Sequence, residues 1–216
     1  MRKAVIVNFD GVILKNRIAN KYISSSIKTY VQCKLQTTNK SIIDTFSKRV
    51  NNDYTHAEHG YSGLAEFNYH VYDSCDAKMK YNMIQMTPEE TGEWYRFKEI
   101  CDTHGVEVLI HTNATINWVR NFIPQEHNHT LVLCEYLENF SYVSDPSIKS
   151  TIMINFIKEK YSKAFLIDTT LNSLIVNGNS FYTRIWFDST ISCDSHILLN
   201  PGFYAINNLE QIGSII

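Results

Sequence analysis

The N-terminal end of the chain carries the stretch that decides its fold, Val5-Ile6-Val7-Asn8-Phe9-Asp10-Gly11-Val12. A short run of β-branched apolar residues that stops at polar side chains is typical of a strand buried on both faces. Residues 4–7 therefore predict a buried strand. The Asp-Gly pair that follows favours a tight turn at its end.

Four further apolar runs along the chain predict strands. They are residues 106–110, 130–133, 164–167 and 181–187. Polar side chains close two of these runs, because Thr112 follows the first of them and Asp168 follows the third. Each run is short and bounded by polar or turn-forming residues, as strands usually are.

Helical patterns lie between the predicted strands. Thr87 is the expected N-cap of one helix, with Pro88 at the first helical position and Glu90 in place for a capping box. Gly105 is the expected stop of that helix. Further helices are expected at residues 113–123, from Ser144 onward and at residues 171–176, and Thr112-Asn113 could cap the first of these.

The order of these elements predicts an α/β fold. Helix and strand alternate from residue 87 to residue 187, which is typical of a Rossmann-like, doubly wound parallel sheet with helices on both faces. Residues 15–86 are instead rich in Ser, Thr, Asn and Tyr and have weak helical periodicity. We interpret them as a mostly helical insert after the first strand, which leaves residues 1–14 and 87–216 as the core domain.

Composition excludes several classes of protein. The net charge of -2 gives no electrostatic reason to expect nucleic acid or an acidic membrane as a partner. No apolar run reaches the roughly 20 residues that span a bilayer, and the N-terminus lacks a signal-peptide pattern. We therefore expect a cytoplasmic location.

The metal-binding residue types outside the strand ends form no convincing pattern. The five cysteines include no CxxC pair, which argues against a disulfide framework and a structural zinc site. His56, His59 and His70 lack a ligand set, so structural or surface roles are favoured. Trp94 and Trp118 are interpreted as core residues.

The motifs resemble those of the haloacid dehalogenase superfamily, in particular its phosphatase-like members with an inserted helical cap. The first motif of that family is a strand followed by Asp-x-Asp-Gly, and residues 5–11 match it except that Asn8 takes the place of the first Asp. Residues 109–113 resemble the second motif, a strand that ends in Thr or Ser. Lys149 begins a helix as the third-motif Lys does, and residues 164–172 resemble the fourth motif.

This resemblance implies a site for phosphoryl transfer. In the family the first Asp attacks the phosphoryl group and the second is the general acid and base, and these positions are Asn8 and Asp10 here. Thr112 and Lys149 would bind the transferring group and neutralise its charge. A Mg²⁺ ion would be held by oxygen ligands from Asn8, Asp10 and Asp168.

Two positions depart from the family's pattern. Asn8 carries a neutral amide, which is a poor nucleophile and does not balance the charge of Mg²⁺. Removal of the nucleophile of a serine protease costs on the order of 10⁶ in rate. Thr169 stands where the fourth motif normally has a second acid. These residues predict a catalytically impaired protein that acts by binding a small phosphorylated ligand or a protein partner.

Two alternatives stay open. The chain could be an active, Mg²⁺-dependent phosphohydrolase, possibly a nucleotidase, whose Asn8 is an engineered replacement of Asp; the retained Asp10, Thr112, Lys149 and Asp168 favour this. It could also be a structural subunit of a larger assembly such as a virus particle, located in the host cytoplasm or the virion. The composition, rich in Asn, Ile and Lys, suggests that second alternative.

Overall fold

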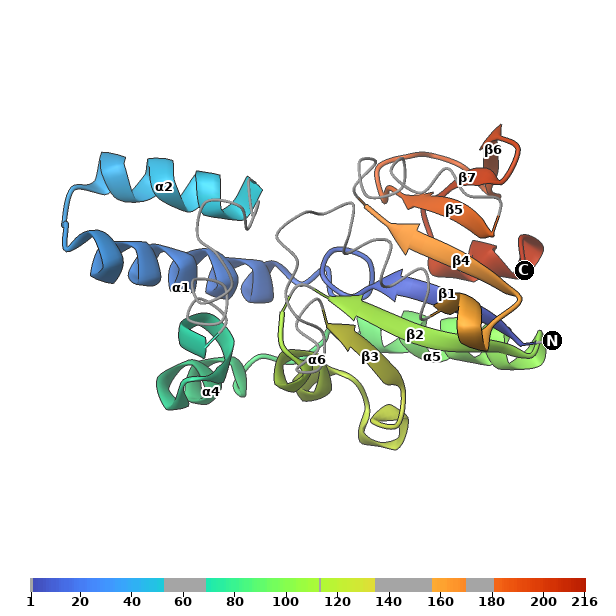
Figure 1. Cartoon of the computed structure of the whole chain (residues 1–216), viewed down its shortest axis with the longest axis horizontal. Helices are drawn as coiled ribbons and strands as arrows, with labels where there is room; N and C mark the ends of the chain where they lie inside the picture. The colour runs from blue at the N-terminus through green and yellow to red at the C-terminus, as the bar shows by residue number, and fades with distance from the viewer. Residues whose placement is uncertain (1, 53–68, 113, 135–156, 170–180) are drawn as a thin grey trace.

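A computed structural model describes residues 2–52, 69–112, 114–134, 157–169 and 181–216 of the chain. Its centre is a sheet with helices packed on both faces, and a group of helices extends from one end of that sheet (Figure 1). The arrowheads of the central strands point toward this group of helices. The insert therefore lies at the carboxyl edge of the sheet, where α/β proteins bind their ligands.

The sheet has the strand order β3-β2-β1-β4-β5-β7-β6. All neighbouring strands are parallel except β6 and β7, which are antiparallel. The five predicted strands are confirmed with shifts of one or two residues at their ends, whereas β6 and β7 were not predicted. The strands are β1 (Lys3–Asn8), β2 (Val106–Thr112), β3 (Leu131–Cys134), β4 (Lys163–Asp168), β5 (Tyr182–Phe187), β6 (Ile197–Asn200) and β7 (Phe203–Ile206).

The first strand is buried on both faces, as its unbroken apolar run predicts. Val5 and Val7 belong to the hydrophobic cluster that includes Trp94. Ala4 and Ile6 belong to a second cluster on the opposite face of the sheet. Because side chains alternate along a strand, both clusters are built on β1, and this strand is the centre of the core.

Helices accompany the sheet in the described part of the core, and residues 157–160 are helical as well. The named elements are α5 (Pro88–Thr103), α6 (Ile116–Phe122), and the short 3₁₀ helices η2 (Gln125–His127) and η3 (Leu209–Ser214). The capping box of α5 is confirmed: Thr87 accepts from the backbone N–H of Glu90, and the Glu90 side chain accepts from that of Thr87. Gly105, with φ of +63°, follows the end of that helix as predicted.

The helix predicted to start at Asn113 begins later. Its N-cap is Thr115, whose hydroxyl accepts from the backbone N–H of Trp118. The expectation that Thr112 caps this helix is wrong. The Thr112 hydroxyl instead accepts from Ala114 N–H and donates to the carboxylate of Asp10. The helices expected from Ser144 onward and at residues 171–176 fall in stretches outside the described residues.

The insert is helical where the structure describes it. Its elements are α1 (Arg17–Leu35), α2 (Lys40–Asn52), the π-helical turn η1 (Tyr69–Asp73) and α4 (Cys75–Tyr81). Apolar side chains from this segment, including Val71, Tyr72 and Tyr81, join the same hydrophobic cluster as Val5 and Val7 of β1. The predicted residues Lys149, His56 and His59 lie outside the described residues. None of the described helices is long and apolar enough to cross a bilayer.

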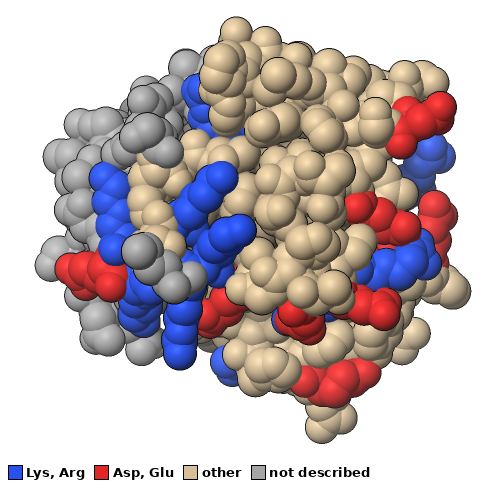
Figure 2. Space-filling model, turned by 90° about the vertical axis from the view of Figure 1, so that its right-hand side faces the viewer, with Lys and Arg blue, Asp and Glu red and all other residues tan. Residues whose placement is uncertain are grey.

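The opposite end of the sheet has a different character. Figure 2 views the molecule from the end away from the insert and shows Lys and Arg side chains gathered on one part of that face. Lys3 and Lys163 are register partners at the start of β1 and β4, and Lys158 and Lys160 are exposed just before β4. Asn8, Thr112 and Asp168, which were predicted to belong to the site, lie at the opposite ends of these strands.

Candidate functional site at the carboxyl edge of the sheet

The turn after β1 places the first two candidate residues. Phe9 stays in the ladder through its N–H, which donates to His111 O at 2.7 Å, and its carbonyl accepts from Ile13 and Leu14 N–H. Gly11 has φ of +92°, a conformation that side chains with a Cβ rarely adopt. This glycine lets the chain fold back, so that Asn8 ends the strand and Asp10 projects from the turn beyond it.

Asn8 and Asp168 meet at the ends of two neighbouring strands. Since β1 and β4 are parallel and adjacent, their last residues lie side by side at one edge of the sheet. The Asn8 side-chain amide donates from Nδ2 to Oδ1 of Asp168 at 3.3 Å. Asp168 is only 5% exposed. In the superfamily that the motifs resemble, the attacking carboxylate stands at the position of Asn8. Here that position presents a hydrogen-bond donor to Asp168.

Both carboxylate oxygens of Asp10 accept hydrogen bonds. The Thr112 hydroxyl donates to Oδ2 at 2.9 Å, and the Trp118 indole N–H donates to Oδ1 at 3.0 Å. Burial raises the pKa of the Asp10 carboxyl, while the two hydrogen bonds and the nearby His111 act in the opposite direction. Thr112, at the end of β2, is fully buried, so its hydroxyl is fixed in place by its two partners.

Trp118 is a core residue, as predicted, but it also belongs to the site. Its ring is fully buried, and its N–H reaches Asp10. Sequence reasoning missed this second role. The signal was present in principle, since a buried indole N–H needs an acceptor, but the sequence does not show which residue provides it. Burial and the negative charge of Asp10 raise the pKa of Tyr72, a neighbour of Trp118, well above its usual value.

Thr169 stands where the fourth motif of the resembled family has a second acid. Thr169 is exposed, and its side chain lies beside the turn: a Cβ built on Gly11 would lie 3.4 Å from the Thr169 methyl carbon. The residue in place of the second family acid is thus next to the site but brings no charge to it. The structure brings together two linked pairs, Asn8 with Asp168 and Asp10 with Thr112.

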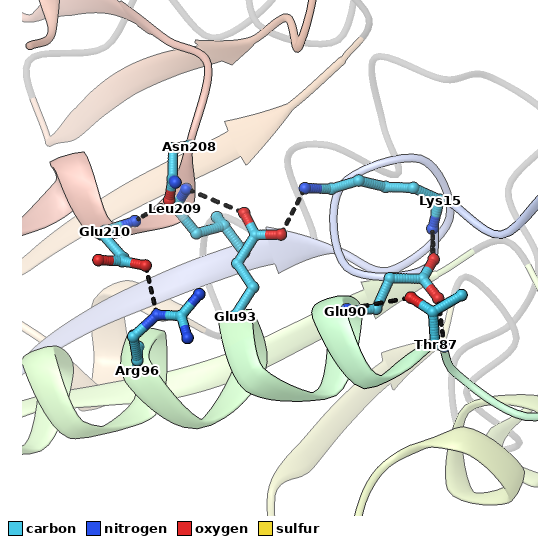
Figure 3. Close-up of polar contacts among 8 residues, drawn as sticks. All are labelled: Lys15, Thr87, Glu90, Glu93, Arg96, Asn208, Leu209 and Glu210. Atoms are coloured by element: carbon cyan, nitrogen blue, oxygen red, sulfur yellow. Dashed lines mark hydrogen bonds and ion pairs between the residues drawn. The ribbon is translucent and has the colours of Figure 1, made fainter. Parts of the chain in front are cut away.

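A second polar network supports the turn from below (Figure 3). The carboxylate of Glu90 accepts from the backbone N–H of Lys15 at 2.6 Å and from that of Thr87 at 2.8 Å. Lys15 also places its ammonium 2.6 Å from Glu93, whose other oxygen accepts from Leu209 N–H. Lys15 and Thr87 border the insert on its two sides. The N-terminal turns of α5 therefore hold both chain segments that connect the insert to the core.

The donor atoms at the carboxyl edge match the chemistry of Mg²⁺ in kind. Carboxylate and amide oxygens, from Asp168 and Asn8, are hard ligands of the type this ion prefers. They supply one negative charge where two carboxylates would supply two. Among the residues that the structure describes, no group of three or more His, Cys, Asp or Glu side chains is arranged to hold a metal ion. A cation here would depend on Asp168 and on neutral oxygen donors.

Comparison with known proteins gives similarity in structure but not in sequence. No protein-family model and no curated protein matches the sequence. A HAD phosphatase from Thermococcus onnurineus superposes with a TM-score of 0.61 at 13% identity, covering 99% of this chain and 97% of that one. CbbY from Rhodobacter sphaeroides, solved in complex with phosphate, gives 0.57 at 11% identity, covering 99% and 97%. The L-2-haloacid dehalogenase RSc1362 gives 0.57 at 10% identity, covering 99% and 98%.

These matches extend over nearly the whole of each chain, insert included. At such low identity they establish the fold. The chain has a haloacid dehalogenase-like fold, a Rossmann-like α/β sheet with polar residues at the carboxyl edge of its central strands.

Proposed function

We propose that the protein binds a phosphorylated small molecule at the carboxyl edge of the sheet and has lost the covalent step of catalysis. The observation that carries the proposal is the hydrogen bond from Asn8 Nδ2 to Asp168 Oδ1. An attacking group must offer a lone pair to phosphorus, and an amide nitrogen has none available because it is conjugated with the carbonyl. Asn8 acts instead as a donor toward the neighbouring acid.

The other site residues suit binding. The Thr112 hydroxyl and the backbone N–H groups of the turn are donors of the kind that bind phosphoryl oxygens. Asp168 and the Asn8 amide oxygen would hold Mg²⁺, which would neutralise phosphate charge when bound. Lys149, at the position of the family's third-motif lysine, would supply a further positive charge. In this proposal Asp10 remains a hydrogen-bond acceptor beside the ligand.

Binding and turnover measured on one preparation test the proposal. Isothermal titration with inorganic phosphate, with and without Mg²⁺, should show saturable binding that is tighter with the ion. A panel of nucleotides and sugar phosphates with Mg²⁺ should be hydrolysed no faster than in buffer. Robust turnover of any substrate by the unaltered chain would overturn the proposal, and so would the absence of phosphate binding.

A matched pair of variants locates the binding. Asp168→Asn should abolish the Mg²⁺-dependent gain in phosphate affinity, because it removes the carboxylate of the proposed cation site. Asp188→Asn is the control, since Asp188 follows the neighbouring strand β5 but is engaged with Thr190 outside the site. Equal effects of the two changes would mean that phosphate binds elsewhere.

A second candidate is an active phosphohydrolase in which Asn8 replaces a natural Asp by engineering. It is supported by Asp10, Thr112 and Asp168, which retain family residue types and lie at one edge of the sheet. Under this reading Asn8→Asp restores Mg²⁺-dependent hydrolysis. A structural role in a larger assembly is supported by composition alone.

A further inference from the structure

Trp118 contacts the site with one edge and the insert with its ring. Its indole N–H donates to Asp10 Oδ1 at 3.0 Å. The ring lies nearly parallel to Tyr22, with centroids 5.6 Å apart, and is approached by Tyr72 and Tyr81 with centroids 5.3 Å away in each case. One fully buried side chain of α6 thus joins a site carboxylate to three tyrosines of the insert.

The three tyrosines come from three separate elements that are tied together. Tyr22 belongs to α1, Tyr72 to η1 and Tyr81 to α4. The Tyr22 hydroxyl donates to Val71 O at 2.8 Å and is 3.3 Å from Ala77 O, which links the three elements through one atom. A displacement of the insert would therefore move all three rings relative to Trp118.

The insert is also fastened directly to the helix that carries Trp118. Asp73 of η1 accepts from the Thr115 hydroxyl at 3.3 Å and from the Asn117 amide at 3.0 Å. Thr115 is the N-cap of α6, and Trp118 follows it by three residues. The first turn of α6 is thus held at its surface by η1 and at its buried side by the tyrosine rings.

The hydrogen bonds of Asp10 make its orientation sensitive to the indole. An indole N–H is a donor only, so Oδ1 must remain an acceptor as long as the contact persists. Thr112 holds the second oxygen. A carboxylate whose two oxygens both accept from buried donors cannot rotate unless one of the hydrogen bonds breaks. Of these two donors, Trp118 is the one that packs against tyrosines of the insert.

We propose that Trp118 is a positioning residue through which the insert sets the orientation of the Asp10 carboxylate. The inference deepens the proposed function, because Asp10 borders the proposed phosphate site. With the insert packed on Trp118, the carboxylate is held toward α6.

Nuclear magnetic resonance of the ligand-free chain tests this coupling. The chain has three tryptophans, and the indole N–H groups donate to three different acceptors: His127 for Trp94, Asp10 for Trp118 and Thr169 O for Trp186. Tyr81→Leu removes an aromatic contact with Trp118 without touching Asp10. We expect it to speed hydrogen exchange of the Trp118 indole by about fivefold, the effect of one lost aromatic pair, and to shift the Asp10 carboxyl carbon signal at constant pH.

Three controls make the result specific. Trp118→Phe should shift the Asp10 carboxyl signal directly, whereas Trp94→Phe, an equally buried indole bonded to His127, should not. Tyr69→Leu changes an exposed tyrosine of η1, the element that carries Tyr72, and should leave both readouts unchanged. The exchange rates of Trp94 and Trp186 report whether each variant keeps its fold, and Tyr22→Leu replaces Tyr81→Leu if the latter unfolds.

Two outcomes would overturn the coupling. One is an Asp10 signal that stays in place in both Trp118→Phe and the insert variant. The other is a rise in exchange at Trp94 equal to that at Trp118, which would indicate general loosening of the core. Both readouts are taken without phosphate or Mg²⁺, so they stand apart from any failure of the proposed binding function.

Discussion

The ammonium of Lys15 lies 2.6 Å from a carboxylate oxygen of Glu93, which joins the turn after β1 to helix α5 (Figure 3). The other oxygen of Glu93 accepts from the backbone N–H of Leu209, at the start of η3. Both side chains are largely buried, with 28% and 11% of their surface exposed. A second ion pair on the same helix, Arg96 with Glu210, is much more exposed.

These two ion pairs should differ in their contribution to stability. Glu93→Gln leaves the Lys15 ammonium without its partner in a largely buried position, and we expect the free energy of unfolding to fall by about 2 kcal/mol. Glu210→Gln breaks an exposed pair and should cost under about 1 kcal/mol. Urea denaturation of both variants measures the difference. Equal losses would show that burial of the Lys15–Glu93 pair has no energetic weight.

Glu90 should be essential for fastening the insert to the core. Its two oxygens accept from backbone N–H groups on the two chain segments that border the insert, at Lys15 and at Thr87. Glu90→Gln replaces one acceptor by a donor, so one N–H faces another donor, and we expect a loss of about 2 kcal/mol in unfolding free energy. The control Glu89→Gln, at an exposed neighbour, should stay within about 0.5 kcal/mol of the unaltered chain. Indistinguishable denaturation curves for the two variants would refute the fastening role.

Gly11 is predicted to tolerate substitution less well than Gly105. Both have positive φ, but a Cβ at Gly11 would meet Thr169 at 3.4 Å, while nothing lies within 4 Å of one at Gly105. Gly105→Ala should cost about 1 kcal/mol from backbone strain alone. Gly11→Ala should cost about 2–3 kcal/mol, because φ of +92° lies outside the usual left-handed region. Thermal unfolding of the two variants provides the comparison, and a larger loss at Gly105 would contradict it.

His127 should make the protein less stable in mild acid. Burial lowers its pKa, and its Nδ1 accepts from the Trp94 indole N–H at 2.8 Å, which requires an unprotonated nitrogen. Because the folded pKa is below the unfolded value of about 6.5, this stabilisation is present above that pH and is lost as the pH falls through the folded pKa. His127→Asn keeps an acceptor that does not titrate, so its unfolding free energy should fall less between pH 7.5 and pH 5. His129→Asn, at the exposed neighbour, should behave like the unaltered chain.

The parts of the fold that follow from local pattern were predictable. The buried strands β1 and β4 appear as unbroken apolar runs, and β2 as an apolar run interrupted only by Glu107. The capping box of α5 appears as Thr87 followed by Glu90. The strand β6 was missed because every one of its residues is exposed, so no burial pattern marks it, and β7 is buried only at its last two residues.

The parts of the site that depend on distant contacts were not predictable. Polar residues at strand ends identify Asn8, Asp10, Thr112 and Asp168, because parallel strands bring their carboxyl ends to one edge. The bond from Trp118 to Asp10 spans 108 positions, and the bond from Lys15 to Glu90 spans 75. Nothing in the local sequence shows such partners, since Trp118 has the pattern of a core residue and Glu90 that of a cap.

We propose that the amide of Asn8 removes covalent catalysis from a site that otherwise has the residue types of phosphatase-like motifs. The most direct measurement is Mg²⁺-dependent hydrolysis of a phosphate monoester panel by the unaltered chain and by Asn8→Asp, side by side. We predict background rates for the unaltered chain and, with the carboxylate restored, a gain of several orders of magnitude, in line with the cost of removing a nucleophile elsewhere. Equal, substantial turnover by both proteins would contradict the account.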